Sequence, residues 1–261
     1  MKNILIFLIL ISACSSREKK SQKIILVHGA HFDERVFTGL KRYFKDQALA
    51  IELPTSTQLG NSEDYFRRLN LSNYASTVCE KLEAIRGKSI LVGHGFGGAV
   101  INQAYGQCPK YFGKMVFIGA TVPHPGETPY QLFTAQDKEH YLKAVTENEE
   151  TFLFEVVDRY VFVDAFAPEA SQEDRELIAN ISKPEPMAPT LSSVQFDLSS
   201  WQSLKKLMII TTADKIVSPE TQRKFTIRMR NTQIKELDSG HLPMITMIDE
   251  LGQLIEAFIM N

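Results

Sequence analysis

The stretch SILVGHGFGGAV, from Ser89 to Val100, joins an apolar run to a cluster of four glycines and the start of a helical pattern. A continuous run of this kind is typical of a buried strand, and the pattern that follows predicts a helix over 97–107. A tight strand-to-helix turn with small neighbours is a setting in which a serine nucleophile is often held. Gly95 occupies the centre of this turn, so the position carries no side chain that could attack a substrate.

The rest of the chain repeats the alternation of strand and helix. Apolar, β-branched runs predict strands over 23–30, 48–54, 89–93, 114–120, 206–212 and 232–238. Helical spacing predicts helices over 73–85, 97–107, 218–229 and 247–260. Strands that are apolar throughout and alternate with helices indicate an α/β fold with a mostly parallel central sheet, covered by helices on both faces.

One region interrupts this alternation. Residues 121–200 hold many of the prolines and acidic residues and several helical stretches, without a strongly apolar strand. We expect this region to be a helical cap inserted over the carboxyl ends of the strands, where ligands bind in such sheets. The α/β domain as a whole is expected to span 23–261.

Composition limits the function classes. The chain has 261 residues, 44% of them hydrophobic, and a formal net charge of −2 at pH 7. This charge argues against a nucleic-acid partner, because nucleic-acid surfaces usually carry a basic excess. The length suits one large α/β domain or two small ones.

The first residues form a separate segment. MKNILIFLILISAC has one lysine and a short apolar run followed by small residues and Cys14, as in a secretory signal. Its end resembles the lipobox of bacterial lipoproteins, which implies a signal peptide over 1–13, a lipidated Cys14, a linker over 14–22 and a place in the cell envelope. Ser15 favours the outer membrane under the same resemblance. An ordinary signal peptide or a fortuitous apolar start is the alternative.

Two further cysteines remain, Cys79 and Cys108, each in or next to a predicted helix. In an oxidising compartment they could pair, but two cysteines in two predicted helices are as easily small buried hydrophobic residues. The sequence leaves their pairing open. The spacing offers no metal motif.

Two more motifs follow the glycine turn along the chain. Asp214 comes directly after a predicted strand in TTADKIVSP, and His241 lies in the loop LDSGHLPM after the last strand. The order of nucleophile position, acid and histidine is that of the α/β-hydrolases. Asp238 is a rival acid three residues before the histidine, but its place in the loop favours contact with solvent.

These motifs together resemble the α/β-hydrolases, and among them most the plant methylesterase and hydroxynitrile lyase group. The chain offers VHGA after the first strand, VGHGFGG at the turn, ADK after the penultimate strand and GHLPM in the histidine loop. The resemblance extends over nearly everything from Lys23 onward. It implies an esterase-like protein for small carboxylic esters or related carbonyl compounds, with no metal and no organic cofactor.

The resemblance also assigns roles to individual residues. Gly95 takes the position of the nucleophilic serine, and Asp214 and His241 form the remaining dyad. Backbone N–H groups of Ala30 and Phe96 are expected to form the oxyanion hole. His31, Phe32 and Lys215 are expected to contact substrate, whereas His28 and His94 are expected to be structural.

Three accounts of Gly95 remain open. In the first, activity is lost and the apolar pocket binds small esters or acids without turnover. In the second, His241 oriented by Asp214 acts as a general base on water or on a carbon acid, without a serine. In the third, the glycine is an engineered substitution or a sequence error in a serine hydrolase. Acyl transfer through a serine is not expected for the chain as written.

Overall fold

The structure is a computed structural model that describes residues 22–54 and 63–261. Its central sheet has six strands in the order β2-β1-β3-β4-β8-β9, and all neighbouring strands pair in parallel. The strands are β1 (Ile24–Val27), β2 (Ala48–Ile51), β3 (Ser89–His94), β4 (Phe112–Ile118), β8 (Lys205–Thr211) and β9 (Thr232–Leu237). The predicted parallel sheet is therefore confirmed, strand by strand.

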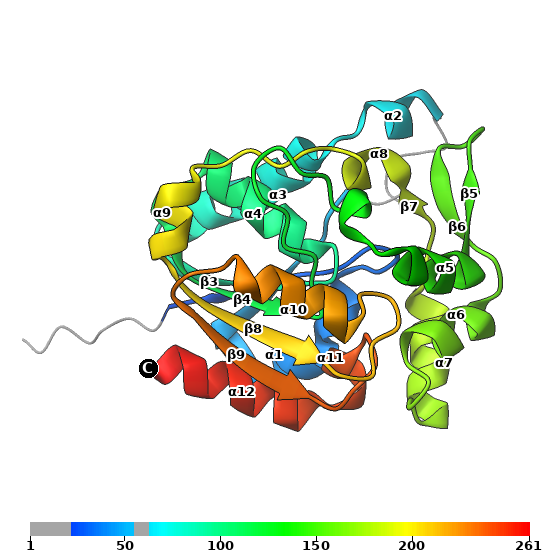
Figure 1. The fold of residues 1–261 in the computed structure, drawn as a ribbon. Coiled ribbons are helices and arrows are strands. Elements are labelled where there is room, and N and C mark those ends of the chain that lie inside the picture. Colours follow the sequence, from blue (N-terminus) through cyan, green and yellow to red (C-terminus); the bar gives the residue numbers. More distant parts are fainter. Residues whose placement is uncertain (1–21, 55–62) are drawn as a thin grey trace, which may run out of the picture.

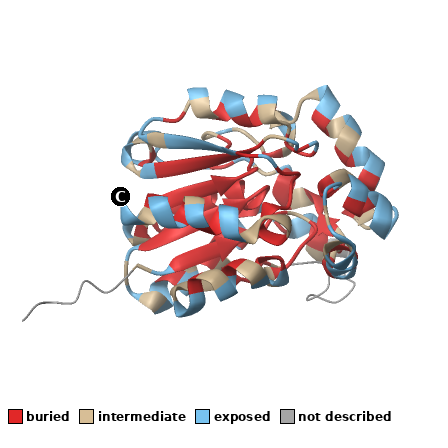
Figure 2. Cartoon of the chain, turned by 90° about the horizontal axis from the view of Figure 1, so that it is seen from below, coloured by how far each residue is buried: buried red, intermediate tan, exposed pale blue. Residues whose placement is uncertain are grey.

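Helices cover both faces of this sheet, as Figure 1 shows. On one face α1 (Thr38–Phe44) packs against α12 (Ile248–Met260), and on the other α3 (Leu71–Ile85) packs against α4 (Gly97–Gln107), with α10 (Pro219–Ile227) beside them. Because both faces are covered, the inner strands are buried along most of their length (Figure 2). Shorter helices are α2 (Glu63–Arg68), α9 (Leu198–Ser203) and α11 (Pro243–Thr246), with 3-10 turns at Glu34–Phe37, Lys45–Gln47, Pro109–Tyr111 and Tyr130–Leu132.

Local sequence explains the limits of these helices, as α3 illustrates. Asn70 accepts a hydrogen bond from the backbone of Asn73, and the Asn73 side chain accepts one from the backbone of Asn70. This reciprocal capping box satisfies two backbone donors that the first helical turn leaves free. The helix ends at Arg86, which has a left-handed conformation. One face of α3, including Tyr74 and Val78, is buried against the sheet and α4.

The cap lies beyond the carboxyl ends of the strands, where the arrows of β8 and β9 point in Figure 1. It contains α5 (Ala135–Ala144), β5 (Val145–Asn148), β6 (Leu153–Val156), α6 (Arg159–Phe166), α7 (Gln172–Ile181), β7 (Glu185–Pro186) and α8 (Met187–Thr190). Strands β5, β6 and β7 form a small antiparallel sheet, so the expectation of a purely helical cap was incomplete. These strands are short and partly polar, and β7 has only two residues. The sequence therefore contains no continuous apolar run that would have predicted them.

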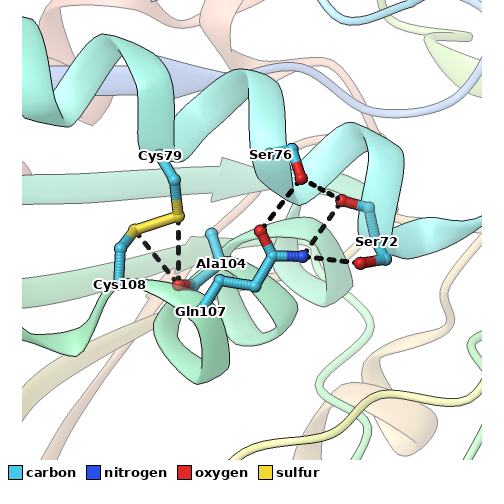
Figure 3. Close-up of a disulfide and its surroundings, with 6 residues drawn as sticks. All are labelled: Ser72, Ser76, Cys79, Ala104, Gln107 and Cys108. Atoms are coloured by element: carbon cyan, nitrogen blue, oxygen red, sulfur yellow. Dashed lines mark hydrogen bonds between the residues drawn. A yellow bond between two sulfur atoms is a disulfide. The ribbon is translucent and has the colours of Figure 1, made fainter.

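The structure pairs the two cysteines whose pairing the sequence left open. Cys79 of α3 and Cys108 at the end of α4 form a disulfide with a Cα–Cα distance of 5.9 Å. Figure 3 shows both sulfur atoms next to the Ala104 carbonyl oxygen, at 3.4 and 3.3 Å. Nearby, the Gln107 amide donates to the backbone and hydroxyl oxygens of Ser72. The side-by-side packing of α3 and α4 brings the two cysteines together, and spacing along the chain does not reveal that.

The signal peptide, most of the linker and the lipidated Cys14 fall on residues 1–21, outside the described part of the chain, and they stay predictions. Within the described ranges, no helix combines the length and the apolar character needed to cross a bilayer.

Candidate active site

Gly95 lies at the turn between β3 and α4, with a φ of 52° in the left-handed region. The surrounding backbone is closely packed. A Cβ atom at Gly93 would lie 2.6 Å from the carbonyl oxygen of Gly97, so a larger residue there would force the turn apart. The small residues around position 95 are thus a requirement of the turn itself. Gly95 adopts this left-handed conformation without strain and lines the pocket, although it has no side chain.

Asp214 and His241 meet as the sequence predicted. The Nδ1 atom of His241 lies 2.7 Å from Oδ2 of Asp214, and both side chains are buried. Four further donors hold the carboxylate. The backbone N–H groups of Ile216 and Val217 donate to Oδ1 at 2.8 and 3.0 Å, and the Thr211 hydroxyl and the Gln222 amide donate to Oδ2 at 2.8 and 3.3 Å. A carboxylate oxygen accepts, so Nδ1 of His241 donates to it, and Nε2 is the ring nitrogen left to act on a ligand.

The Nε2 atom of His241 faces Gly95. A Cβ built on that glycine would lie 3.0 Å from Nε2. Among the described residues, Nε2 has no hydrogen-bond partner, and His241 lines a pocket. The ring therefore presents a bare, oriented nitrogen to whatever molecule occupies the space above Gly95.

The cap and the glycine turn together hold the histidine loop. The His241 backbone N–H donates to the Phe166 carbonyl at 2.7 Å, and the N–H of Gly240 donates to Glu169 at 2.8 Å. From the other side, Nε2 of His94 donates to the His241 carbonyl at 2.8 Å, which fits the structural role expected of His94. Sequence reasoning missed Phe166 and Glu169, because cap residues carry no motif that links them to the histidine.

Ala30 and Phe96, the expected oxyanion-hole residues, both line the pocket next to Gly95. In the described part of the chain, neither backbone N–H donates to another protein group. Two free N–H groups beside the reacting position can stabilise negative charge that develops on a carbonyl oxygen. His28 is buried and accepts from the Leu53 N–H at 3.2 Å, and burial lowers its pKa to about 4. It holds the loop that carries Ala30.

The pocket is small and partly open to solvent, and its walls are mainly apolar and aromatic. Its lining residues are Ala30, His31, Gly95, Phe96, Thr121, Pro129, Tyr130, Phe133, Tyr141, Phe154, Phe166, Thr190, Ile216, Val217 and His241. Residues of the sheet domain form its floor, and the cap supplies most of its rings. Such a pocket suits a small apolar ligand.

The three predicted substrate contacts differ in their placement. His31 lines the pocket, whereas Phe32 is buried in edge contact with the stacked rings of Phe162 and Phe166 and is not among the lining residues. Lys215 is exposed and also lies outside the lining. The rival acid Asp238 is exposed and accepts from the Thr212 hydroxyl at 3.1 Å. The structure thus pairs the histidine with Asp214.

The parallel sheet, the turn, the acid and the histidine loop define an alpha/beta hydrolase. The chain belongs to the Alpha/beta hydrolase family, whose model matches residues 24–254. Among its relatives, a chloroplastic Arabidopsis thaliana protein assigned as methylesterase 14 is 23% identical over 250 residues, which cover 90% of this chain and 71% of the relative. Norfluorocurarine synthase 2 from a Strychnos species is 26% identical over 255 residues, which cover 91% and 95%. The resemblance to the methylesterase group is confirmed.

Solved structures show the same fold. A pyrethroid hydrolase from Sphingobium faniae superposes with a TM-score of 0.81 at 18% identity, over 91% of this chain and 97% of that one. Methylketone synthase I from tomato, in complex with 2-tridecanone, superposes with a TM-score of 0.75 at 21% identity, over 91% and 97%. At identities this low, the structural likeness establishes a shared fold and nothing further. The family and its relatives indicate a hydrolase of the esterase type.

Proposed function

We propose that this protein acts on small, mainly apolar carboxylic esters or related carbonyl compounds, with His241 as general base and without a covalent intermediate. The observation that carries this proposal is the orientation of the dyad: Asp214 fixes one nitrogen of His241, and the other faces Gly95 at the floor of the pocket. Burying a carboxylate is costly unless several donors compensate it. A pocket that only binds would need neither the carboxylate nor the oriented histidine.

For an ester, the following sequence fits the geometry. The carbonyl oxygen of the substrate accepts hydrogen bonds from the N–H groups of Ala30 and Phe96. A water molecule above Gly95 gives a proton to Nε2 of His241, and its oxygen bonds to the carbonyl carbon. The protonated histidine, stabilised by Asp214, then gives this proton to the departing alkoxide as the ester C–O bond breaks. The products are a carboxylic acid and an alcohol.

The same atoms support a second reaction, proton removal from a carbon next to a carbonyl. Nε2 of His241 would take the proton, and the two N–H groups would hold the resulting enolate oxygen. The apolar pocket favours ligands with little other polarity. A ketone is the ligand named in the structure of tomato methylketone synthase I, so a neighbour with this fold accommodates a carbonyl compound that is not an ester.

Binding without turnover is the competing function. The aromatic walls and the missing side chain at Gly95 favour it, because tight binding of an apolar ligand requires only complementary surface. The Asp214–His241 dyad argues against a function in binding alone, because a protein that only binds its ligand does not need a histidine nitrogen directed at the reacting position. The two functions make opposite predictions for one substitution.

The experiment is hydrolysis of p-nitrophenyl acetate and butyrate by the purified protein and its His241→Ala variant. We expect measurable turnover that falls by about 10² to 10⁴-fold in the variant. His140→Ala is the matched control, because it removes an imidazole on α5 that does not line the pocket, and its rate should equal the parent's. A parent rate no higher than that of His241→Ala would leave binding as the function.

We also propose that the protein works in the cell envelope, anchored through Cys14. The Cys79–Cys108 disulfide supports an oxidising compartment, because structural disulfides persist there and are rare in a reducing cytoplasm. The full chain, expressed in a bacterium, should partition with membranes and carry lipid on Cys14. Cys14→Ser should release it from the membrane fraction, and an unmodified parent protein in the soluble fraction would contradict the proposal.

A further inference from the structure

Tyr141 and His31 form a polar pair in the otherwise apolar wall of the pocket. The Tyr141 hydroxyl lies 2.6 Å from Nε2 of His31, and both residues line the pocket. The hydroxyl of Thr190, another lining residue, is engaged within the protein, because it donates to the Met187 carbonyl at 2.8 Å. Two other hydroxyls belong to lining residues: Thr121 donates to the Gly95 carbonyl at 3.5 Å, and Tyr130 donates to Glu147 at 2.7 Å. Both members of the Tyr141–His31 pair are buried, so a ligand in the pocket would meet this pair among the aromatic rings.

The direction of the Tyr141–His31 hydrogen bond follows from the other nitrogen of the imidazole. Nδ1 of His31 lies 3.0 Å from the Lys183 carbonyl oxygen, which can only accept, so Nδ1 carries the proton. Burial lowers the pKa of His31 to about 4, so the ring is neutral at pH 7. Nε2 then has no proton and accepts. The Tyr141 O–H must donate to it.

Contacts with the cap prevent the His31 ring from flipping, which would exchange the positions of its two nitrogens. The His31 backbone N–H donates to Glu185 at 3.1 Å, and the His31 carbonyl accepts from the Lys183 N–H at 3.0 Å. Together with the Nδ1 contact, these bonds hold His31 at a φ of 70°, a left-handed conformation that side-chain-bearing residues adopt only where the surroundings impose it. A turned ring would place a bare nitrogen against the Lys183 carbonyl.

The consequence concerns the oxygen atom of Tyr141. Its single proton is committed to His31, so it can offer a ligand only lone pairs. Rings of Phe133 and Phe154, both in the pocket lining, pack against the Tyr141 ring with centroids 5.9 and 5.4 Å away, so a ligand group next to Tyr141 meets mainly apolar surface. An ether or ketone oxygen at this place would face another acceptor, and both would be desolvated without a hydrogen bond.

We infer that Tyr141 is a specificity residue that selects carbonyl compounds bearing a hydrogen-bond donor, a hydroxyl or N–H, away from the reacting carbonyl. This inference deepens the proposed function and rests on it for the placement of the carbonyl group near Gly95. His31 is the positioning residue that fixes the donor direction of Tyr141. The pocket thus recognises one hydrogen-bond donor on a ligand that is otherwise mainly aromatic.

The test uses ketones, because they carry a carbonyl group but no ester bond to hydrolyse. Binding of 2′-, 3′- and 4′-hydroxyacetophenone and their methoxy counterparts is measured by titration calorimetry. We expect at least one hydroxy isomer to bind roughly tenfold more tightly than its methoxy partner. In Tyr141→Phe this ratio should fall to about one, while affinity for the methoxy ketone is retained, which also shows that the pocket remains folded.

Tyr105→Phe is the matched control. Tyr105 is a buried tyrosine of α4 that packs against Phe112 and Phe196 and does not line the pocket, so the preference should be unchanged in this variant. Equal affinities for hydroxy and methoxy ketones, no binding by any of the six, or a preference that persists in Tyr141→Phe would overturn the inference. A ketone preference without ester hydrolysis would instead support the role of Tyr141 and refute the proposed hydrolysis.

Discussion

The Nε2 atom of His241 lies 3.0 Å from the position that a Cβ would take at Gly95. A serine Cβ at this distance is tighter than ordinary contact, so the His241 ring would have to shift by a few tenths of an ångström, and the serine hydroxyl would then lie beside Nε2. Here the same separation leaves the basic nitrogen facing open pocket. The rest of the apparatus, from the Asp214 carboxylate to the free N–H groups of Ala30 and Phe96, is in place around a residue that cannot attack.

The glycine itself should matter for stability. At a φ of 52°, an L side chain is strained, so Gly95→Ala should lower the free energy of unfolding by about 1–2 kcal/mol. Gly87→Ala is the matched control, since a Cβ there meets nothing within 4 Å and its φ is not positive. Urea denaturation measures both. Equal effects of the two substitutions would contradict a strained turn at residue 95.

Asp214 should be required for activity. Asp214→Asn replaces an acceptor of the His241 Nδ1–H and no longer stabilises the imidazolium, so ester turnover should fall by about 10² to 10⁴-fold. Asp238→Asn alters the rival carboxylate, which is exposed, and should leave the rate unchanged. Steady-state kinetics of the two variants shows which of the two aspartates orients His241. A large loss in Asp238→Asn and none in Asp214→Asn would reverse the assignment of the acid.

Glu185 should make stability depend on pH. Burial raises the pKa of this carboxyl to about 7, above its ordinary 4.5, so the folded state retains a proton that the unfolded chain loses as pH rises. Its contribution is therefore present below pH 4.5 and is lost towards pH 7. Relative to Glu185→Gln, the unfolding free energy of the parent should fall by about 3 kcal/mol across this window.

Urea denaturation at several pH values between 4.5 and 7 measures this difference. The comparison with Glu185→Gln removes the opposite trend of buried histidines such as His28 and His31, whose lowered pKa values make the protein less stable as pH falls. Parallel curves for parent and variant would show that Glu185 keeps an ordinary affinity for protons.

The disulfide should contribute substantially to stability. Cys79 and Cys108 are 29 residues apart. A disulfide that closes a loop of this length lowers the conformational entropy of the unfolded chain, which stabilises the folded state by about 3–4 kcal/mol. The double variant Cys79→Ala/Cys108→Ala should be less stable than the oxidised parent by this amount. Adding dithiothreitol should destabilise the parent and leave the variant unaffected. Insensitivity of the parent to the reductant would contradict a structural disulfide.

Much of the fold was predictable because each signal is local. The apolar run at 89–93 predicts a buried strand wherever that strand lies in a sheet covered on both faces. The motifs around Gly95, Asp214 and His241 follow one another along the chain in the order found in the α/β-hydrolases. A parallel sheet aligns the carboxyl ends of its strands, so the acid and the histidine loop had to meet at one edge. Topology thus explains why Asp214 and His241 lie close together, and the family resemblance is what assigned them as a dyad.

The remaining features depend on contacts between segments far apart in the chain. Nothing near Glu185 in the sequence indicates that it binds the backbone of His31, 154 residues away. The same holds for Tyr141, which meets His31 only when the cap folds over the sheet. Cap strands that are short and half polar give no apolar run, and the disulfide depends on how α3 packs against α4. Tertiary packing decides all of these.

The most direct test of a dyad that works without a covalent intermediate is the intact mass of the protein, quenched during turnover of p-nitrophenyl butyrate. We predict that the parent releases p-nitrophenol while its mass stays unchanged. Gly95→Ser, with a hydroxyl next to Nε2 of His241, should gain the mass of a butyryl group. A butyryl adduct on the parent, or no p-nitrophenol release above that of His241→Ala, would contradict the account.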